Sequence, residues 1–261
     1  MGPPPDDSSD MPLEKAYKNP DFLLGEDARP VRILCEYLEP LARFEKHSVR
    51  RAIIFFGSAR LRTIAPGADG TSGRDYYAMA ADLAEKLARW TLKHHAPKDR
   101  YYLCTGSGPG IMEAAGRGVA RVDRKLSIGL NISLPFEQFM NEFVTEDLAF
   151  EFHYFFMRKF WFMKLAEAMV VFPGGYGTFD ELFEMLTLVQ TGKAAPMPFV
   201  LFGREFWEET INFQALVRRG LISPEDVDRI FFADSVDEAF DYLTRRLTDA
   251  SEPLTSPSAA A

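Results

Sequence analysis

The sequence predicts an α/β fold, a Rossmann-like three-layer sandwich in which helices cover both faces of a mostly parallel sheet. Two observations lead to this prediction. Short apolar runs of strand length recur along the chain, and longer amphipathic segments with helical spacing separate them. The apolar runs contain few polar residues, so each strand is expected to be buried on both faces, which is typical of parallel sheets.

The first half of the chain begins with a helix and then alternates strands with helices. We expect helices at residues 29–47 and 74–93 and a third helix that starts after Pro109. Pro40 predicts an irregularity in the first helix, because proline cannot donate the helical hydrogen bond. The expected strands are AIIFFG at 52–57, YYLCTG at 101–106, SIGLNI at 127–132 and EFVTE at 142–146.

The second half of the chain continues this alternation. The expected helices are at 153–168, 178–192, 204–220 and 235–247, and the expected strands are MVVFP at 169–173, FVLFG at 199–203 and RIFFAD at 229–234. Ligands bind beyond the carboxyl ends of the strands in such folds. The chemistry is therefore expected in the strand-to-helix turns.

The composition predicts one globular domain at residues 21–249, between tails at 1–20 and 250–261 that are rich in Pro, Ser, Ala and Asp and are expected to be disordered. A net charge of −8 without basic runs argues against nucleic-acid binding. We find no signal peptide and no run of membrane-spanning length, which predicts a cytoplasmic protein without membrane contact. Cys35 and Cys104 are expected to be buried thiols. No metal-ligand spacing occurs, and no cofactor is expected.

Three strand ends are marked by glycine: GSAR at 57–60, TGSGPGIME at 105–113 and PGGYGTFDE at 173–181. Glycine lets the backbone approach a ligand closely and point its N–H groups at an anion. Two such turns on different strands suggest a shared phosphate pocket, although a purely structural role is an alternative for GSGPG. The third glycine of the dinucleotide-binding fingerprint would fall at Ile111, so the NAD pattern is not met.

The third turn carries two signals. Thr178 and Glu181 have the spacing of a capping box, in which Thr178 caps the helix and Glu181 reaches back to the Thr178 amide. That structural role does not explain the PGG run at 173–175 or Gly177. A loop of this kind leaves amides facing outward, where they can bind an anion. Asp180 and Glu181 would lie beside that anion, which is electrostatically costly unless the carboxylates have a function.

PGGYGTFDE resembles the P-G-G-x-G-T-x-x-E signature of the LOG family, the cytokinin riboside 5′-monophosphate phosphoribohydrolases, long mislabelled as lysine decarboxylases. That family carries an upstream Arg-Lys pair, and Arg158-Lys159 has the matching spacing, with Arg158 23 residues before Glu181. The resemblance covers roughly residues 50–235, and TGSGPGIMEAAGRG is similar to a loop of the longer bacterial members. IME stands where plant-type members have G-L-M-G, so plant-hormone specificity does not follow.

The resemblance implies a hydrolase that cleaves a nucleoside 5′-monophosphate to a free base and ribose 5-phosphate. It also implies a homodimer or higher homo-oligomer with the pocket near the subunit interface. Glu181 would stabilise positive charge on the ribose, and Arg158 would assist the departing base or clamp the phosphate or ribose. The residues implied or suggested to contact the substrate are Ser58, Gly108, Glu113, Glu137, Lys159, Gly174, Gly175, Tyr176, Gly177, Thr178, Asp180 and Thr187.

Other hypotheses stay open at this point. A non-catalytic nucleotide or molybdenum-cofactor binding protein would use similar glycine-rich loops, but it has no need of both Arg158 and Glu181. Arg158 could also be an exposed helix arginine, and the aromatic segment at 153–162 could be a base-stacking wall, core or a dimer face. Ile111 disfavours an NAD-linked oxidoreductase. A pyridoxal-phosphate lysine decarboxylase is disfavoured because no lysine has a recognisable cofactor-binding context.

Overall fold

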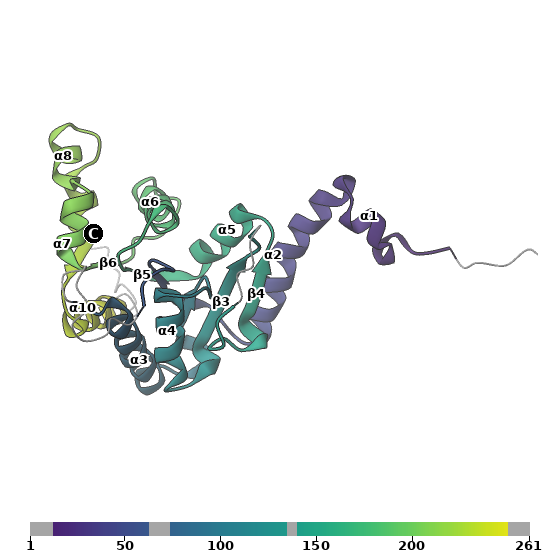
Figure 1. Cartoon of the computed structure of the whole chain (residues 1–261), viewed down its shortest axis with the longest axis horizontal. Coiled ribbons are helices and arrows are strands. Elements are labelled where there is room, and N and C mark those ends of the chain that lie inside the picture. The colour runs from purple at the N-terminus through teal and green to yellow at the C-terminus, as the bar shows by residue number, and fades with distance from the viewer. Residues whose placement is uncertain (1–12, 63–73, 135–139, 250–261) are drawn as a thin grey trace, which may run out of the picture.

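Seven parallel strands form a sheet in the order β4-β3-β2-β1-β5-β6-β7 in the computed structural model, which describes residues 13–62, 74–134 and 140–249 (Figure 1). The strands are β1 (Arg51–Phe56), β2 (Tyr101–Thr105), β3 (Ser127–Ile132), β4 (Ala149–Phe152), β5 (Ala166–Val171), β6 (Phe199–Phe202) and β7 (Ile230–Ala233). The predicted α/β fold with a parallel sheet is confirmed.

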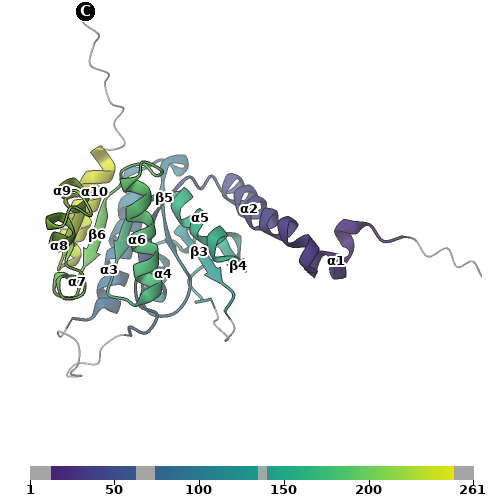
Figure 2. The ribbon, with the colours of Figure 1, turned by 90° about the horizontal axis from the view of Figure 1, so that it is seen from above.

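Helices cover both faces of this sheet. They are α1 (Pro20–Leu24), α2 (Arg29–Lys46), α3 (Tyr76–His94), α4 (Ile111–Ala120), α5 (Phe155–Leu165), α6 (Tyr176–Gln190), α7 (Arg204–Thr210), α8 (Phe213–Arg218), α9 (Pro224–Asp228) and α10 (Val236–Asp249). Helices α3, α4 and α10 pack together over one face, and α2, α5 and α6 lie over the other (Figures 1 and 2). Helix α1 and the N-terminal part of α2 extend away from the sheet on the β4 side. Helix α2 runs through Pro40 as one helix.

Burial accounts for the order of the strands. Every residue of β2, β3 and β6 is buried, and β1 is buried from Ala52 onward. At the edge of the sheet, β4 alternates instead: Phe150 and Phe152 are buried, and Glu151 is exposed. Strands with continuous apolar runs therefore occupy the interior positions, where helices cover both faces, and an alternating strand occupies an edge.

The strand predicted at 142–146 is wrong, and the edge strand is β4, a segment with no predicted strand. Residues 142–144 form a turn and a bend. Asn141 holds this segment: its backbone N donates to the carbonyl oxygen of Ser107 at 2.8 Å, and its side-chain Nδ2 donates to the carbonyl oxygens of Ser107 and Gly108 at 2.9 and 3.1 Å. These bonds attach the segment to the loop after β2 and keep it out of the sheet.

Two predicted helices have different bounds. The helix expected at 153–168 ends at Leu165, because the chain becomes extended at Ala166 and pairs there with Ala52 of β1. The helix expected at 204–220 is divided into α7 and α8. Asn212 causes this division, since its side-chain oxygen accepts a hydrogen bond from the backbone N of Ala215 at 2.8 Å and caps a new helix.

The two cysteines differ in their environment. Cys104 is buried in β2, and burial raises the pKa of its thiol well above the usual value. Cys35 is exposed on α2, so its predicted burial is wrong. Within the predicted N-terminal tail, residues 13–20 are described, are mostly exposed and include a 3-10 helix at Ala16–Lys18. None of the helices described has the length and apolar character required to cross a membrane.

Candidate active site

The carboxyl ends of β1 and β5 meet where the order of the sheet reverses. The chain continues from β1 through α3 to β2 on one side, and from β5 through α6 to β6 on the other. A hydrogen bond of 3.0 Å from the backbone N of Ser58 to the carbonyl oxygen of Pro173 joins the loops that follow these strands. Such a topological switch point is where open α/β sheets bind ligands.

A cavity of about 810 Å³ opens at this point. Ligand sites usually have volumes of roughly 300–1,000 Å³, so the cavity is large enough for a nucleotide-sized molecule. The residues that line it come from the end of β1 and its loop, the β2–α4 turn, α5 and the start of α6: Phe56, Gly57, Ser58, Ala59, Arg60, Gly106, Met112, Arg158, Gly175, Tyr176, Gly177, Thr178, Phe179 and Glu181.

The N-terminus of α6 presents free backbone amides to this cavity. Its N-cap is Gly175, whose carbonyl oxygen accepts from the backbone N of Thr178 at 2.9 Å and of Phe179 at 3.0 Å. The amides of Tyr176 and Gly177 have no acceptor among the described residues. The predicted capping box is therefore wrong: the helix begins before Thr178, and Glu181 does not reach back to it. Free amides at a helix N-terminus favour an anion.

The glycines of this turn have different reasons to be glycine. A Cβ at Gly174 would lie 2.1 Å from Oγ1 of Thr178, so the fold itself requires glycine there. At Gly175 and Gly177, a Cβ would meet nothing within 4 Å, and neither residue has a positive φ. Because neither crowding nor backbone conformation explains them, these two glycines leave open space on the cavity side of the helix start.

Arg158 of α5 and Glu181 of α6 form a buried ion pair at the cavity wall. Nη2 of Arg158 lies 3.2 Å from Oε1 of Glu181, and the side chains are 14% and 6% exposed. The guanidinium also lies over the rings of Phe155 and Phe162, at 5.1 and 5.7 Å from their centroids. Its Nε is buried and has no hydrogen-bond partner within the described residues. The alternative of an exposed helix arginine is thus excluded for Arg158.

Burial controls the protonation of this pair. It raises the pKa of Glu181 to about 7, against the opposing effect of Arg158 and Lys159. Burial also lowers the pKa of Arg158, while the charge of Glu181 opposes that shift. A guanidinium remains charged in proteins. Glu181 is therefore a carboxyl group that exchanges its proton near neutral pH beside a permanent cation, as an acid–base or charge-stabilising group requires.

Lys159 and Asp180 lie outside this cavity. Nζ of Lys159 is 2.7 Å from Oδ2 of Asp180 and 2.7 Å from Oε2 of Glu184. Burial alone would lower the pKa of Lys159, but the two hydrogen-bonded carboxylates outweigh it and raise that pKa. These side chains line a shallower groove on the outer side of α5 and α6. Their visible role is to join the two helices that carry Arg158 and Glu181.

The second glycine turn makes contacts inside the protein. The carbonyl oxygen of Gly108 accepts from Asn141, and Gly108 does not line the cavity. Gly110 has a φ of +72°, and a Cβ there would lie 2.3 Å from the carbonyl oxygen of Ser58. The backbone N of Ile111 donates to the same oxygen at 3.1 Å. This turn packs closely against the loop after β1, which explains its glycine without a ligand.

Of three further residues that were predicted to contact the substrate, one lines the cavity. Ser58 lines the cavity, and its Oγ accepts from the backbone N of Arg60 at 3.1 Å, which leaves the hydroxyl proton free to donate to a ligand. Glu113 lies outside the cavity lining and accepts a 2.7 Å hydrogen bond from the hydroxyl of Tyr77. Burial and this bond raise the pKa of Tyr77 to about 12. Glu137 is outside the described residues.

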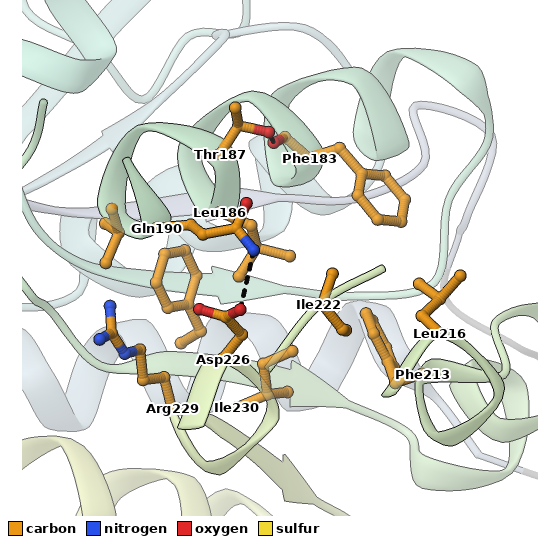
Figure 3. Close-up of a pocket in the computed structure, with 12 residues that line it drawn as sticks. Phe183, Leu186, Thr187, Gln190, Phe213, Leu216, Ile222, Asp226, Arg229 and Ile230 are labelled. Atoms are coloured by element: carbon orange, nitrogen blue, oxygen red, sulfur yellow. Dashed lines mark hydrogen bonds between the residues drawn. The ribbon is translucent and has the colours of Figure 1, made fainter. Parts of the chain in front are cut away.

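Thr187 lines a second cavity, of about 90 Å³, between α6 and the α8–α9 region (Figure 3). Its hydroxyl donates to the carbonyl oxygen of Phe183 at 2.7 Å. Phe213, Leu216 and Ile222 make this pocket mainly apolar, and Asp226 at its edge accepts from Gln190 at 2.8 Å. The pocket is small and holds no glycine loop, so the larger cavity is the better candidate.

The structure thus brings together Ser58, Arg158, Glu181 and the 175–178 turn, and places Gly108, Glu113, Lys159, Gly174, Asp180 and Thr187 outside the lining of their cavity. None of the aromatic side chains of 153–162 lines it. Seven other residues that do line it have no predicted role: Phe56, Gly57, Ala59, Arg60, Gly106, Met112 and Phe179. Arg60 follows the GSA turn directly and Gly106 belongs to TGSGPG, so position after a strand was the available signal. Within the described residues, no cluster of three or more His, Cys, Asp or Glu could hold a metal ion.

Comparison with known proteins identifies a family to which the sequence is similar. The family model described as "Possible lysine decarboxylase" matches residues 112–243, just over half of the chain. No curated protein matches the sequence. Among solved structures, the chain is similar to the molybdenum cofactor binding protein from the phototrophic bacterium Rippkaea orientalis, with a TM-score of 0.50 and 17% identity over 76% of this chain and 98% of that chain. At this identity the likeness shows the fold alone.

Proposed function

The chain belongs to the family described as possible lysine decarboxylase, to which the LOG proteins that its motifs resemble also belong, and we propose that it is a nucleoside 5′-monophosphate phosphoribohydrolase. The reaction is the hydrolysis of the N-glycosidic bond, which gives a free base and ribose 5-phosphate. The observation that carries the proposal is the buried Arg158–Glu181 pair, which shares one cavity with the free amides at the start of α6.

The phosphate fits the start of α6 best. The amides of Tyr176 and Gly177 lack acceptors in the described part of the chain, and Gly175 and Gly177 leave room for a bulky anion to approach them. The hydroxyl of Ser58 adds a possible donor from the neighbouring loop. Binding this non-reacting group supplies energy for alignment of the reacting bond, so the phosphate would hold C1′ of the ribose near the ion pair.

The chemistry follows from the two charges. As the bond from C1′ to the base nitrogen breaks, its electron pair leaves with the base and positive charge develops on the ribose. The Glu181 carboxylate stabilises that charge and accepts a proton from the attacking water. The oxygen of that water forms the new bond to C1′. Arg158 stabilises the electron density on the departing base, which gains a proton from the surroundings.

The cavity does not favour a pyridoxal-phosphate decarboxylase. Such an enzyme needs a lysine that forms a Schiff base with the cofactor. No lysine lines the described cavity, and nearby Lys159 is held by Asp180 and Glu184, each 2.7 Å away. A non-catalytic binding protein for a nucleotide or for molybdenum cofactor remains the competing hypothesis, since its ligand would also use the phosphate-binding turn.

A substrate panel tests the proposal. Purified protein is incubated with purine, pyrimidine and cytokinin riboside monophosphates, and chromatography measures the free base. We expect base and ribose 5-phosphate in equal amounts from at least one of them. Glu181→Gln should lower turnover by about 100-fold or more, with an unchanged circular dichroism spectrum. Glu209→Gln, at an exposed position of α7, is the matched control and should retain activity.

One result would contradict the proposed hydrolase activity, and another would contradict the role of Glu181. If no nucleotide on the panel releases a base, the protein is not a phosphoribohydrolase for these substrates. A pterin-type ligand that then co-purifies tightly with the protein would support the binding protein instead. If Glu181→Gln turns over at the native rate, Glu181 has no part in the reaction.

A further inference from the structure

Arg60 is a cation in the cavity that has no counter-charge among the described residues. Its side chain is exposed and lines the cavity, and no hydrogen bond or ion pair joins its guanidinium to any other described residue. Nearby Arg62 differs, because its Nη1 donates to the carbonyl oxygens of Ala59 and Leu61 at 2.8 and 3.3 Å. Arg158 is also paired, with Glu181. Arg60 is therefore available to a ligand.

The backbone places Arg60 beside the anion-binding turn. The amide of Arg60 donates to Oγ of Ser58, and the amide of Ser58 donates to the carbonyl oxygen of Pro173, directly before Gly174. These two bonds, of 3.1 and 3.0 Å, couple the loop that carries Arg60 to the loop that starts α6. A long, flexible arginine side chain on this loop can reach an anion held at that helix start.

Charge balance shows why the site needs such a cation. The charged side chains among the described lining residues are Arg60, Arg158 and Glu181. When Glu181 is ionised it cancels the charge of Arg158, and Arg60 is left as the net positive charge. A phosphate monoester carries about −1.5 to −2 charges at neutral pH. The helix dipole supplies only about half a positive charge, so amides alone leave much of this charge uncompensated.

We propose that Arg60 is the specificity-determining residue that selects a substrate with a terminal phosphate monoester over the corresponding nucleoside. The inference rests on the proposed function and adds a residue to it. The planar guanidinium donates two parallel hydrogen bonds to phosphate oxygens, which an ammonium group cannot do with the same geometry. Arg60 contacts the phosphate and does not take part in bond cleavage, so it controls binding.

Steady-state kinetics with Arg60→Gln, Arg60→Lys and the matched control Arg62→Gln test this role, using one accepted nucleoside 5′-monophosphate and the same nucleoside without phosphate. Arg60→Gln should raise KM for the nucleotide by about 10- to 100-fold, with kcat within about twofold of native. The KM of Arg60→Lys for the nucleotide should lie between those of native protein and Arg60→Gln. The kcat/KM for the nucleoside should not change, and Arg62→Gln should behave as native protein does.

A binding measurement separates this inference from the proposed function. Calorimetric titration with ribose 5-phosphate and with ribose requires no turnover. We expect binding of ribose 5-phosphate to weaken about 10-fold or more in Arg60→Gln, while Arg62→Gln binds as native protein does. In one outcome, native protein releases no base from any nucleotide while Arg60→Gln still binds ribose 5-phosphate more weakly than native protein does. That outcome would reject the proposed hydrolase activity and would support the role of Arg60 in phosphate binding. Three results would overturn the role of Arg60. Arg60→Gln could bind ribose 5-phosphate as tightly as native protein does, both variants could lose the same affinity, or native protein could fail to bind ribose 5-phosphate.

Discussion

Gly174 and Gly177 lie three residues apart in one turn, but the two positions are glycine for different reasons. The side chain of Thr178 packs back over Gly174 and leaves no room for a Cβ. Gly177 is the second residue of α6, with open space around it and no positive φ. Glycine inside a helix is less stable than alanine. A residue that weakens its own helix without a steric reason is best explained by a ligand that must come close.

Alanine substitutions separate these two constraints. Gly177→Ala should leave thermal stability unchanged or raise it, by up to about 1 kcal/mol. Its methyl group would occupy the space beside the free amides, so KM for the nucleotide should rise by about tenfold or more. Differential scanning fluorimetry and steady-state kinetics measure the two effects.

Gly174→Ala is the matched comparison. Its Cβ would lie 2.1 Å from Oγ1 of Thr178, so this variant should lose stability, with a lower melting temperature. Native-like substrate binding by Gly177→Ala would show that no ligand approaches the start of α6. A lower melting temperature in Gly177→Ala than in Gly174→Ala would show that the packing argument is wrong.

Helices α5 and α6 bring together the two side chains that we propose take part in the reaction. Arg158 and Lys159 are neighbours on α5, and Glu181 lies beside Asp180 on α6. The inner pair, Arg158 and Glu181, faces the cavity, and the outer cluster around Lys159 joins the same helices from the other side. The two charges of the Arg-Lys dipeptide therefore face different sides: Arg158 pairs with Glu181 at the cavity, and Lys159 pairs with Asp180 and Glu184 outside it.

A second element-scale feature is the segment at 141–144, which Asn141 attaches to the loop after β2. Its side chain donates to the carbonyl oxygens of Ser107 and Gly108, and its Oδ1 accepts from the backbone N of Phe143 at 3.1 Å. Both carbonyl groups belong to buried residues. A buried carbonyl without a partner costs free energy, so this asparagine stabilises the second glycine turn.

Asn141→Ala should therefore destabilise the protein by about 1–3 kcal/mol, which chemical denaturation measures as a lower midpoint. Asn19→Ala is the matched control. Asn19 caps the short helix α1 through an exposed hydrogen bond to the backbone N of Phe22, so its loss should have a smaller effect on the midpoint. Equal midpoints for Asn141→Ala and native protein would mean that the segment is held by other contacts.

At the scale of the whole molecule, the buried carboxyl of Glu181 couples folding to pH. Its pKa is about 7 in the folded protein, whereas the ordinary pKa of an exposed glutamate is 4.5. Below pH 4.5 both the folded and the unfolded states are protonated and the group has no effect. As pH rises toward 7, the unfolded chain has released a proton that the folded protein keeps, so the free energy of unfolding falls.

The Glu181→Gln variant lacks this titration. Its free energy of unfolding relative to native protein should increase from pH 5 to pH 8, by up to about 3 kcal/mol. Loss of the partner of Arg158 adds an offset that does not vary with pH in this range. Urea denaturation at several pH values measures the difference. Glu209→Gln, which changes an exposed glutamate, should follow native protein. A difference that stays flat with pH would show that Glu181 has an ordinary pKa.

The homodimer or higher homo-oligomer implied by the sequence resemblance stays a prediction. Sedimentation velocity would measure the mass in solution. The single domain at 21–249 and the tails at 1–20 and 250–261 likewise stay predictions.

Sequence patterns located elements well where one local signal dominated. The mainly apolar runs of β1, β2, β3 and β6 predicted buried strands, because short runs with few polar residues suit a position covered on both faces. We predicted no strand at β4 because its Ala-Phe-Glu-Phe run is short and is interrupted by the charged Glu151. EFVTE has the composition of a strand, but the backbone of its segment bonds to the β2–α4 loop through Asn141. Contacts between segments far apart in the chain, such as these, cannot be predicted from the local sequence.

Periodicity and motifs are properties of the chain, so they were enough to predict the fold class, the glycine turn at 173–178 and the spacing of Arg158 from Glu181. Which residues share the cavity follows from the packing of helices and loops in three dimensions. This packing brought Arg60 into the lining and turned Glu113 toward Tyr77. It also buried Glu181 beside Arg158 and so moved its pKa to about 7. Burial and charge proximity depend on how the helices pack across the sheet, which no local pattern encodes.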